Sequence, residues 1–145
     1  MLNISHFKII AVGKIKKKWI QEGIEMYLKR LPGLEIIEIK DNSLAKEEHT
    51  IKEIISKNEI LVTLNENGQA FTSKQLATKL LNSHNQNITF VIGGASGLSP
   101  SLNKFASWQL SLSPLTFPHE IARLLLIEQL YRAKTITQGG PYHKE

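Results

Sequence analysis

The stretch Ile88 to Pro100, ITFVIGGASGLSP, places the tightest limits on how this chain can fold. It opens with β-branched and aromatic apolar residues, a pattern typical of a buried strand. Gly93, Gly94 and Gly97 then follow within five positions. Glycine allows a positive φ and lets the backbone approach a ligand closely. Because ligands of open α/β sheets bind just beyond the carboxyl ends of strands, this stretch predicts a binding edge there.

The same glycines also fit an ordinary turn between a strand and a helix, since glycine is the commonest residue in such connections. The established phosphate-binding motifs do not match. GGASG is neither GxGxxG nor GxxxxGK[ST], and no lysine follows the last glycine. The glycine pattern therefore gives little support to a dinucleotide site or a P-loop.

The composition narrows the class of protein. We expect residues 1–145 to form one domain, and the absence of cysteine excludes disulfides, thiol nucleophiles and cysteine-bound metals. No apolar run approaches the length of about 18 residues that a membrane span needs, and no signal peptide is recognisable. We therefore expect a cytoplasmic protein without a membrane partner. The net charge of +5 modestly favours a polyanionic partner such as nucleic acid.

The chain begins with a predicted strand, Phe7 to Val12, which ends at Gly13. A predicted helix closed by Pro32 follows, and its apolar residues should share one face. These residues are Trp19, Ile20, Ile24, Tyr27, Leu28 and Leu31. Four lysines precede them, namely Lys14, Lys16, Lys17 and Lys18. Four cations in a first helical turn oppose the helix dipole, so the cluster fits either a solvated helix start or a surface that faces phosphates.

Strands and helices continue to alternate through the middle of the chain. The predicted elements are a strand at Leu34 to Ile39, a polar loop at Asp41 to His49, a short helix around Ile51 to Ile55, a strand at Glu59 to Leu64, a turn at Asn65 to Gln69 and a helix capped by Thr72 or Ser73.

The C-terminal part contains the longest predicted helix. Pro100 should start a short helix, and Trp108 to Ser113 alternates as a strand does. The helix Pro118 to Lys134 is apolar around most of its circumference, so it must be buried on several sides. In so small a domain the second buried side fits another copy of the chain, which predicts a homodimer. A central helix buried within one chain is the alternative.

Five strands that alternate with helices predict an α/β fold with a mostly parallel sheet covered by helices. General topology rules favour an unknotted, doubly wound arrangement of these elements.

Four segments taken together are more specific than any of these patterns. They are AVGKIKKKWIQEGIEMYLKRL near the start, FVIGGASGLSP, LSPLTFPHEIARLLLIEQLYRA and the terminal PYHKE. With them the chain resembles, over essentially its whole length, the SPOUT-class ribosomal RNA large subunit methyltransferase H family. The resemblance implies an enzyme that uses S-adenosylmethionine to methylate N3 of a pseudouridine in large-subunit (23S) ribosomal RNA. The chain departs slightly at Met1 to Ser5 and in the short Asp41 to His49 loop, away from the motifs.

The resemblance also implies a SPOUT fold with a deep trefoil knot in the C-terminal half, an exception to the topology rules above. It implies a homodimer with sites near the subunit interface, acting on ribosomal RNA in the assembled ribosome without a metal. The knot loops would form the cofactor pocket, where glycine admits the ligand and apolar side chains pack the adenine. The residues that match the family's S-adenosylmethionine contacts are Leu64, Gly93, Leu112, Ser113, Pro114, Leu115, Thr116 and Phe117.

Two histidines are candidates for removing the proton that a pyrimidine N3 carries, since histidine accepts protons near neutral pH. His119 opens the long helix beside the cofactor loop, and capping of that helix is its alternative role. His143 lies in the C-terminal tail, which the resemblance places at the active site together with Tyr142. Tyr142 offers a ring on which a base can stack, and Lys144 a phosphate contact. A frayed tail is the alternative.

Arg123 and Arg132 are candidates for contacts with RNA phosphates. Their alternative role is an ion pair, and Glu128 precedes Arg132 at the favourable spacing of four residues.

Two other classes of function stay open. A non-catalytic ribosome-binding or RNA-binding factor would bind RNA without S-adenosylmethionine. A nucleotide-using enzyme of the doubly wound type would instead prefer NAD or ATP. The intact cofactor segments favour the methyltransferase over both.

Overall fold

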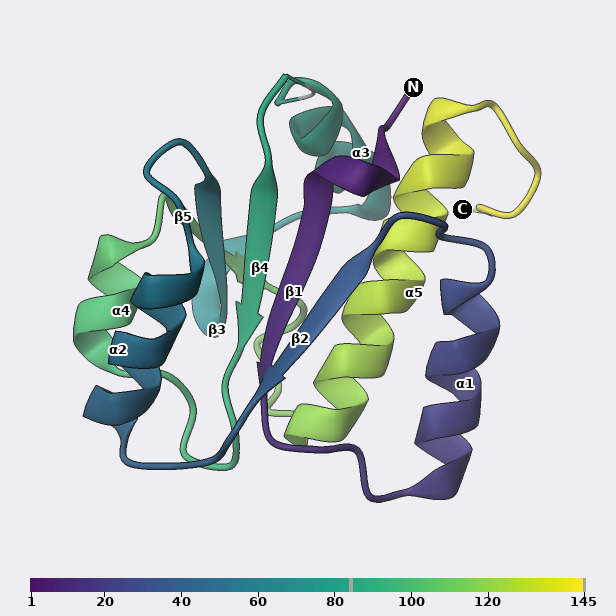
Figure 1. Cartoon of the computed structure of the whole chain (residues 1–145). Helices are drawn as coiled ribbons and strands as arrows, with labels where there is room; N and C mark the ends of the chain where they lie inside the picture. Colours follow the sequence, from purple (N-terminus) through teal and green to yellow (C-terminus); the bar gives the residue numbers. More distant parts are fainter. Residues whose placement is uncertain (84, 145) are drawn as a thin grey trace.

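The computed structural model describes residues 1–83 and 85–144, so Glu145 of the predicted tail lies outside the described residues. Its parallel strands form a five-stranded sheet in the order β2-β1-β4-β3-β5 (Figure 1). The strands are β1 (Phe7–Val12), β2 (Glu35–Ile39), β3 (Ile60–Ala70), β4 (Ile88–Ile92) and β5 (Trp108–Ser111). The prediction of an α/β fold with a parallel sheet is confirmed.

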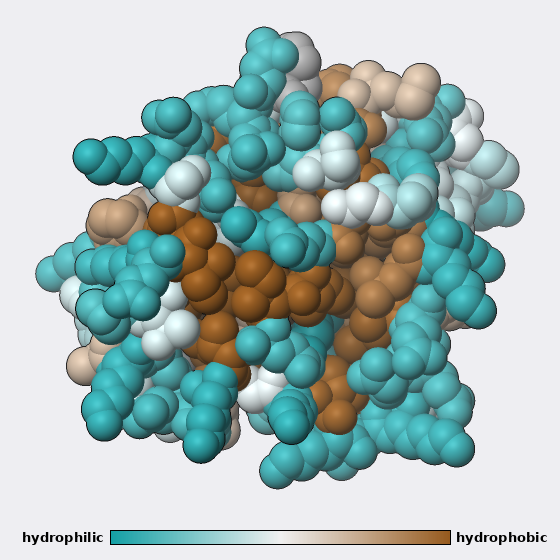
Figure 2. All heavy atoms as spheres, in the orientation of Figure 1, coloured by the Kyte–Doolittle hydropathy of each residue, from teal (hydrophilic) through white to brown (hydrophobic). Residues whose placement is uncertain are grey.

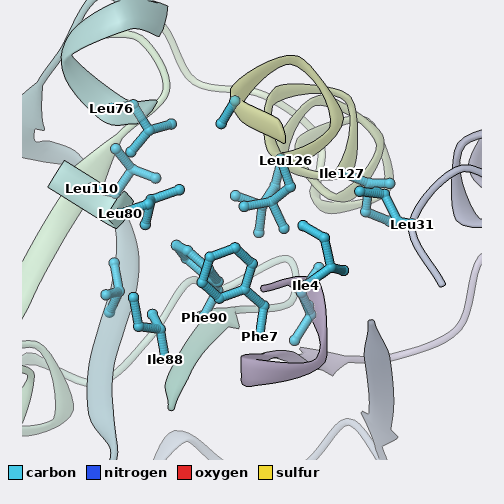
Figure 3. Close-up of a cluster of buried hydrophobic side chains, with 14 of the residues drawn as sticks. Ile4, Phe7, Leu31, Leu76, Leu80, Ile88, Phe90, Leu110, Leu126 and Ile127 are labelled. Atoms are coloured by element: carbon cyan, nitrogen blue, oxygen red, sulfur yellow. The ribbon is translucent and has the colours of Figure 1, made fainter. Parts of the chain in front are cut away.

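Helices cover both faces of this sheet (Figure 1). One face carries α1 (Lys18–Leu28), α3 (Ser73–Leu81) and α5 (His119–Thr137), and the other carries α2 (Leu44–Ile54) and α4 (Pro100–Phe105). A short 3₁₀ helix, η1 (Ile4–His6), precedes β1. The apolar core is accordingly divided into two clusters, one on each face. Figure 3 shows side chains of the larger cluster, in which Phe7 and Phe90 lie under Leu126 and Ile127 of α5.

β4 lies in the middle of the sheet, and all five of its residues are buried. Its continuous apolar sequence is what a strand covered on both faces requires. Ile92 pairs with Ala11 near the end of β1, so the glycine loop begins where β1 also ends.

α2 occupies most of the segment Asp41 to His49, so the prediction of a loop there is wrong. The Ser43 side chain caps this helix by accepting a hydrogen bond from the backbone N–H of Lys46 (3.3 Å). The buried carboxylate of Glu47 accepts another from the backbone N–H of Asn42 (2.8 Å). The polar composition that suggested a loop therefore belongs to a capped helix start.

β3 runs through the predicted turn at Asn65 to Gln69, so that prediction is also wrong. Leu64 and Gln69 both face Leu110 of β5, which means that the residues between them bulge out of the ladder. A Cβ on Gly68 would come within 2.7 Å of a backbone oxygen of β5. Glycine at this position allows β3 and β5 to approach each other closely. It does not mark a reversal of the chain, as a turn would.

The first helix starts later than predicted, because α1 begins at Lys18 and leaves Lys14 and Lys16 in the preceding loop. Ile20 is fully buried, as expected, but Trp19 is 60% exposed. The assignment of Trp19 to the buried face is therefore wrong.

Near the C-terminus, β5 ends at Ser111, before the predicted end at Ser113. α5 continues past Lys134 to Thr137, where Gly139 follows with a φ of 70°. This positive φ is typical of the glycine that ends a helix. None of the helices within residues 1–83 and 85–144 is long and apolar enough to cross a membrane.

The sheet is open at β2, an edge strand whose Ile36 and Ile37 are only half-buried. Figure 2, drawn in the orientation of Figure 1, shows an apolar band across the middle of the molecule. Figure 1 shows β2 in this region, between α2 and α1. The edge strand thus leaves apolar side chains in contact with solvent.

Candidate functional site

A cavity of about 380 Å³ lies at the carboxyl edge of the sheet, within the size range of small-molecule sites. It is lined by the bulged part of β3, by the glycine loop after β4 and by the loop between β5 and α5. The predicted cofactor residues that line it are Leu64, Gly93, Leu112, Ser113, Leu115, Thr116 and Phe117. Pro114 belongs to the same loop but is not among the lining residues. Three segments that are far apart in the sequence therefore meet at one cavity.

The glycine loop closes on itself. The backbone N–H of Gly97 donates to the carbonyl oxygen of Gly94 (3.0 Å), and Gly97 has a φ of 73°. A Cβ on Gly93 would lie 2.5 Å from the carbonyl carbon and oxygen of Gly97. The absence of a side chain at Gly93 thus makes room for the loop's own backbone, whereas the sequence suggested room for a ligand.

Hydrogen bonds tie the β5–α5 loop to β3. The hydroxyl of Thr116 donates to the carboxylate of Glu66 (2.6 Å), and the hydroxyl of Ser111 donates to the backbone oxygen of the same residue (3.1 Å). Glu66 lines the cavity but was not a sequence candidate, because it falls in the segment predicted as a turn. The only available signal was its position two residues after Leu64.

Asn103 is a second lining residue that the sequence did not indicate. It comes from α4, and its Oδ1 is buried without a hydrogen-bond partner among the described residues. A buried acceptor without a partner is costly unless a ligand or water satisfies it. Leu112 and Phe117 contribute apolar side chains to the same cavity, which therefore fits a ligand with an apolar surface.

His119 lies at the start of α5 and lines the same cavity. Its Nε2 is 3.9 Å from the position that a Cβ on Gly13 would occupy, so the imidazole reaches toward the end of β1. Pro118 occupies the N-cap position, and no side chain caps the helix. The alternative role of His119 as a helix cap is therefore wrong. The structure brings this histidine together with the predicted cofactor residues.

Arg123 is buried inside the protein and does not lie on its surface. Its side chain is 3% exposed. Its Nη1 donates to the Glu38 carboxylate (2.5 Å) and its Nη2 to the carbonyl oxygen of Gly13 (3.0 Å). These bonds hold the ends of β1 and β2 against α5. Arg123 is thus buried away from any surface where it could contact RNA phosphates, and its alternative role, an ion pair, is the one observed.

The C-terminal tail packs on α5 and α1, so its alternative description as a frayed end is wrong. The Tyr142 hydroxyl donates to the Glu128 carboxylate (2.8 Å) and lies 3.1 Å from the Tyr27 hydroxyl. The Tyr142 ring meets that of Tyr131 edge-on, with centroids 4.7 Å apart. Burial raises the pKa of the Tyr142 hydroxyl, and its bonds to Tyr27 and Glu128 raise it further, so this group stays protonated as a donor.

Arg132 joins this tail cluster through two partners. It forms the expected ion pair with Glu128 (2.8 Å), which raises the pKa of the guanidinium. Its Nη1 lies 3.1 Å from Nδ1 of His143. Since a guanidinium can only donate, Nδ1 must accept, and the neutral imidazole then carries its proton on Nε2. Lys144 follows as an exposed residue.

The predicted site residues thus occupy two places within one chain. His119 lies at the cavity, whereas His143 contacts Arg132, thirteen positions further along α5. At the rise of an α-helix these positions are roughly 20 Å apart. A single copy of the chain does not bring Tyr142 or His143 to the cavity. Among the described residues, no group of three or more His, Asp or Glu side chains could hold a metal.

Comparisons with known proteins point in one direction. A family described as "Predicted SPOUT methyltransferase" matches residues 5–143. The chain is 90% identical over its full length, and that of the relative, to "Ribosomal RNA large subunit methyltransferase H" of Prochlorococcus marinus (strain NATL2A). It is 51% identical to a protein of the same name from Synechococcus sp. (strain CC9311), with 99% of each chain covered.

A solved structure has a similar fold. It is a probable methylase family protein from Haemophilus influenzae Rd KW20, matched with a TM-score of 0.62 at 12% identity. The match covers 99% of this chain and 72% of the other.

Proposed function

Because the chain belongs to the SPOUT methyltransferase family, we propose that it transfers a methyl group from S-adenosylmethionine to large-subunit ribosomal RNA. The observation that carries this proposal is the cavity at the carboxyl edge of the sheet. All the residues matched to methyl-donor contacts line it, with the exception of Pro114. The apolar side chains of its walls, among them Leu112 and Phe117, fit a ligand that carries an aromatic ring.

The finer features of the proposal follow the family resemblance. The acceptor is N3 of a pseudouridine in 23S ribosomal RNA. The enzyme acts on this nucleoside within the assembled ribosome, in the cytoplasm. Residues 1–145 act as one SPOUT domain with a trefoil-knotted C-terminal half. The working unit is a homodimer, and its contact surface includes the outward side of α5, where Leu125 is half-buried.

The residues of the cavity have to position two reactants and manage one proton. When bound, S-adenosylmethionine supplies an electrophilic methyl group. The acceptor N3 carries a proton that must leave, and the imidazole of His119, which lines the cavity, can take it. The β5–α5 loop, tied to Glu66 through Thr116, keeps the wall of the cavity in place. Such positioning contributes a large part of the rate in a two-reactant transfer.

Tyr142 and His143 enter this scheme only through a second subunit. Within one chain they lie roughly 20 Å from His119 along α5. We infer that the tail of one subunit engages the RNA at the cavity of the other. For this, His143 must leave Arg132, because that contact occupies its Nδ1.

Calorimetric titration tests the cofactor class first. We expect the purified protein to bind S-adenosylmethionine and its demethylated product, and to bind neither NAD nor ATP. Large ribosomal subunits that lack the modification should then accept labelled methyl groups in the presence of the protein. Ribosome binding without methyl-donor binding or methyl transfer would identify the non-catalytic factor instead, and selective NAD or ATP binding would identify the nucleotide-using enzyme.

A further inference from the structure

An exposed basic segment follows β1 in the chain. None of its residues takes part in the methyl transfer proposed for the cavity. We call residues Lys14 to Trp19 the lysine segment. The segment exposes five side chains, those of Lys14, Lys16, Lys17, Lys18 and Trp19. Trp19 is 60% exposed, more than any other tryptophan or phenylalanine among the described residues. Across residues 1–83 and 85–144, no carboxylate forms an ion pair with any of these four lysines.

The backbone of the lysine segment is nevertheless held firmly. The buried carboxylate of Glu120 accepts hydrogen bonds from the backbone N–H groups of Lys16 (2.9 Å) and Lys17 (3.1 Å). These bonds, with that of Lys17 the stronger contributor, keep the pKa of the Glu120 carboxyl below its ordinary value. At the segment's start, Gly13 donates to the backbone oxygen of Ile39 (2.9 Å). A fixed backbone that carries exposed lysine side chains is the arrangement of a preorganised binding surface.

The anchor also fixes where the segment lies. Glu120 directly follows His119, which lines the cavity. The imidazole of His119 is also close to Gly13, the residue just before the lysine segment. The segment therefore lies next to the part of the cavity that His119 lines.

The local electrostatics favour a polyanion at this surface. α1 has no acidic residue in its first turn and no side-chain cap, while lysines crowd around its positive end. Cations at a helix N-terminus repel one another and are also repelled by the positive end of the helix dipole. The phosphates of an RNA backbone would offset both costs.

We propose that the lysine segment is the docking surface for ribosomal RNA, with lysines on the phosphates and Trp19 stacked on an unpaired base beside the target nucleoside. This rests on the proposed function and names the surface that brings the substrate to its site. Lysine contacts with phosphates combined with aromatic stacking are typical of proteins that bind single-stranded RNA. A second copy of the chain is the other occupant that could cover Trp19, and the test includes it.

The charge contribution is tested with Lys16→Gln/Lys17→Gln, which leaves the backbone anchor to Glu120 intact. Lys46→Gln/Lys57→Gln is the matched control, because it removes the same charge from exposed positions near α2 on the other face. Binding to large ribosomal subunits that lack the modification is measured over a series of salt concentrations. We expect the slope of log affinity against log salt to fall by about 1.4 to 1.8 for the first variant, with no such change for the control. Equal slopes for both variants would overturn the proposal.

Stacking is tested with Trp19→Ala, which removes a mostly solvent-exposed ring. We expect the affinity for the same subunits to fall by about five-fold or more. The mass measured by light scattering and the affinity for S-adenosylmethionine should stay those of the unmodified protein. A loss of dimer mass in this variant would instead assign Trp19 to the contact between subunits and overturn its role in stacking.

Failure of this inference is distinguishable from failure of the proposed function. If the unmodified protein neither binds S-adenosylmethionine nor methylates the subunits, the function itself is wrong. If it does both, but the Lys16/Lys17 variant keeps the salt slope of the control, only the docking surface is wrong.

Discussion

Individual side chains at the cavity have roles that depend on where their partners lie. Gly93 is glycine because the backbone of Gly97 occupies the space of a side chain. Arg123 is buried because Glu38 and the end of β1 satisfy most of its guanidinium. His119 is the exception, since it lines the cavity without a hydrogen bond to another side chain among the described residues. This freedom is what a group that exchanges a proton with a substrate requires.

Replacing His119 with alanine should separate binding from chemistry. We expect the variant to keep most of its affinity for S-adenosylmethionine while its kcat for methyl transfer falls about 100-fold or more, the usual contribution of a general base. His49→Ala is the control, because His49 is 75% exposed and pairs with Glu53 on the surface of α2. An unchanged kcat in His119→Ala would remove this residue from the mechanism.

Among the helices, α2 and α4 are joined by one carboxylate. Glu48 of α2 accepts hydrogen bonds from Ser99 (2.6 Å) and Ser101 and pairs with Lys52 (2.7 Å). Ser99 also caps α4, the helix that carries Asn103 to the cavity. This connection therefore holds the far side of the site in place. Lys52, followed by Ser101 and Ser99, lowers the pKa of Glu48 from 4.5 to about 2.

The lowered pKa predicts a specific pH dependence. A carboxyl group with a depressed folded-state pKa stabilises the fold above its unfolded pKa, and this contribution is lost as the pH falls through the folded value. Glu48→Gln should therefore lower the urea midpoint of unfolding at pH 7, and the difference from the unmodified protein should shrink between about pH 4.5 and pH 2. Glu53→Gln on the same helix should show little effect, because Glu53 is 67% exposed. A difference that stays constant with pH would contradict the assignment.

For the chain as a whole, α5 connects the two places where site residues gather. Its first turn contributes His119 to the cavity, and its later turns hold Tyr142 and His143 through Glu128 and Arg132. α5 packs between α1 and α3 on one face of the sheet, so intramolecular contacts account for much of its apolar character. The homodimer stays a prediction, and so does the knot.

Mixing two inactive variants tests whether sites are shared between subunits. A deletion from Pro141 to the end removes the tail, and His119→Ala disables the cavity. If the tail serves the other subunit, half of a random mixture consists of mixed dimers with one complete site each, so about a quarter of the normal activity should return. No recovery, with mixed dimers shown by mass, would assign the tail to its own subunit. A deletion that leaves both methyl-donor binding and turnover unchanged would exclude the tail from the site.

Local patterns in the sequence were enough for the parallel α/β class, for β4 with its glycine loop and for a cap of α3 at Thr72 or Ser73, of which Thr72 is the one observed. These features depend on neighbouring residues, whose spacing is visible in the sequence. The family resemblance indicated the cavity loops. The bulge at Gly68, the exposure of Trp19, the burial of Arg123 and the docking of Tyr142 were decided by tertiary structure. Each depends on a partner far away along the chain, and residue order carries no local signal of such partners.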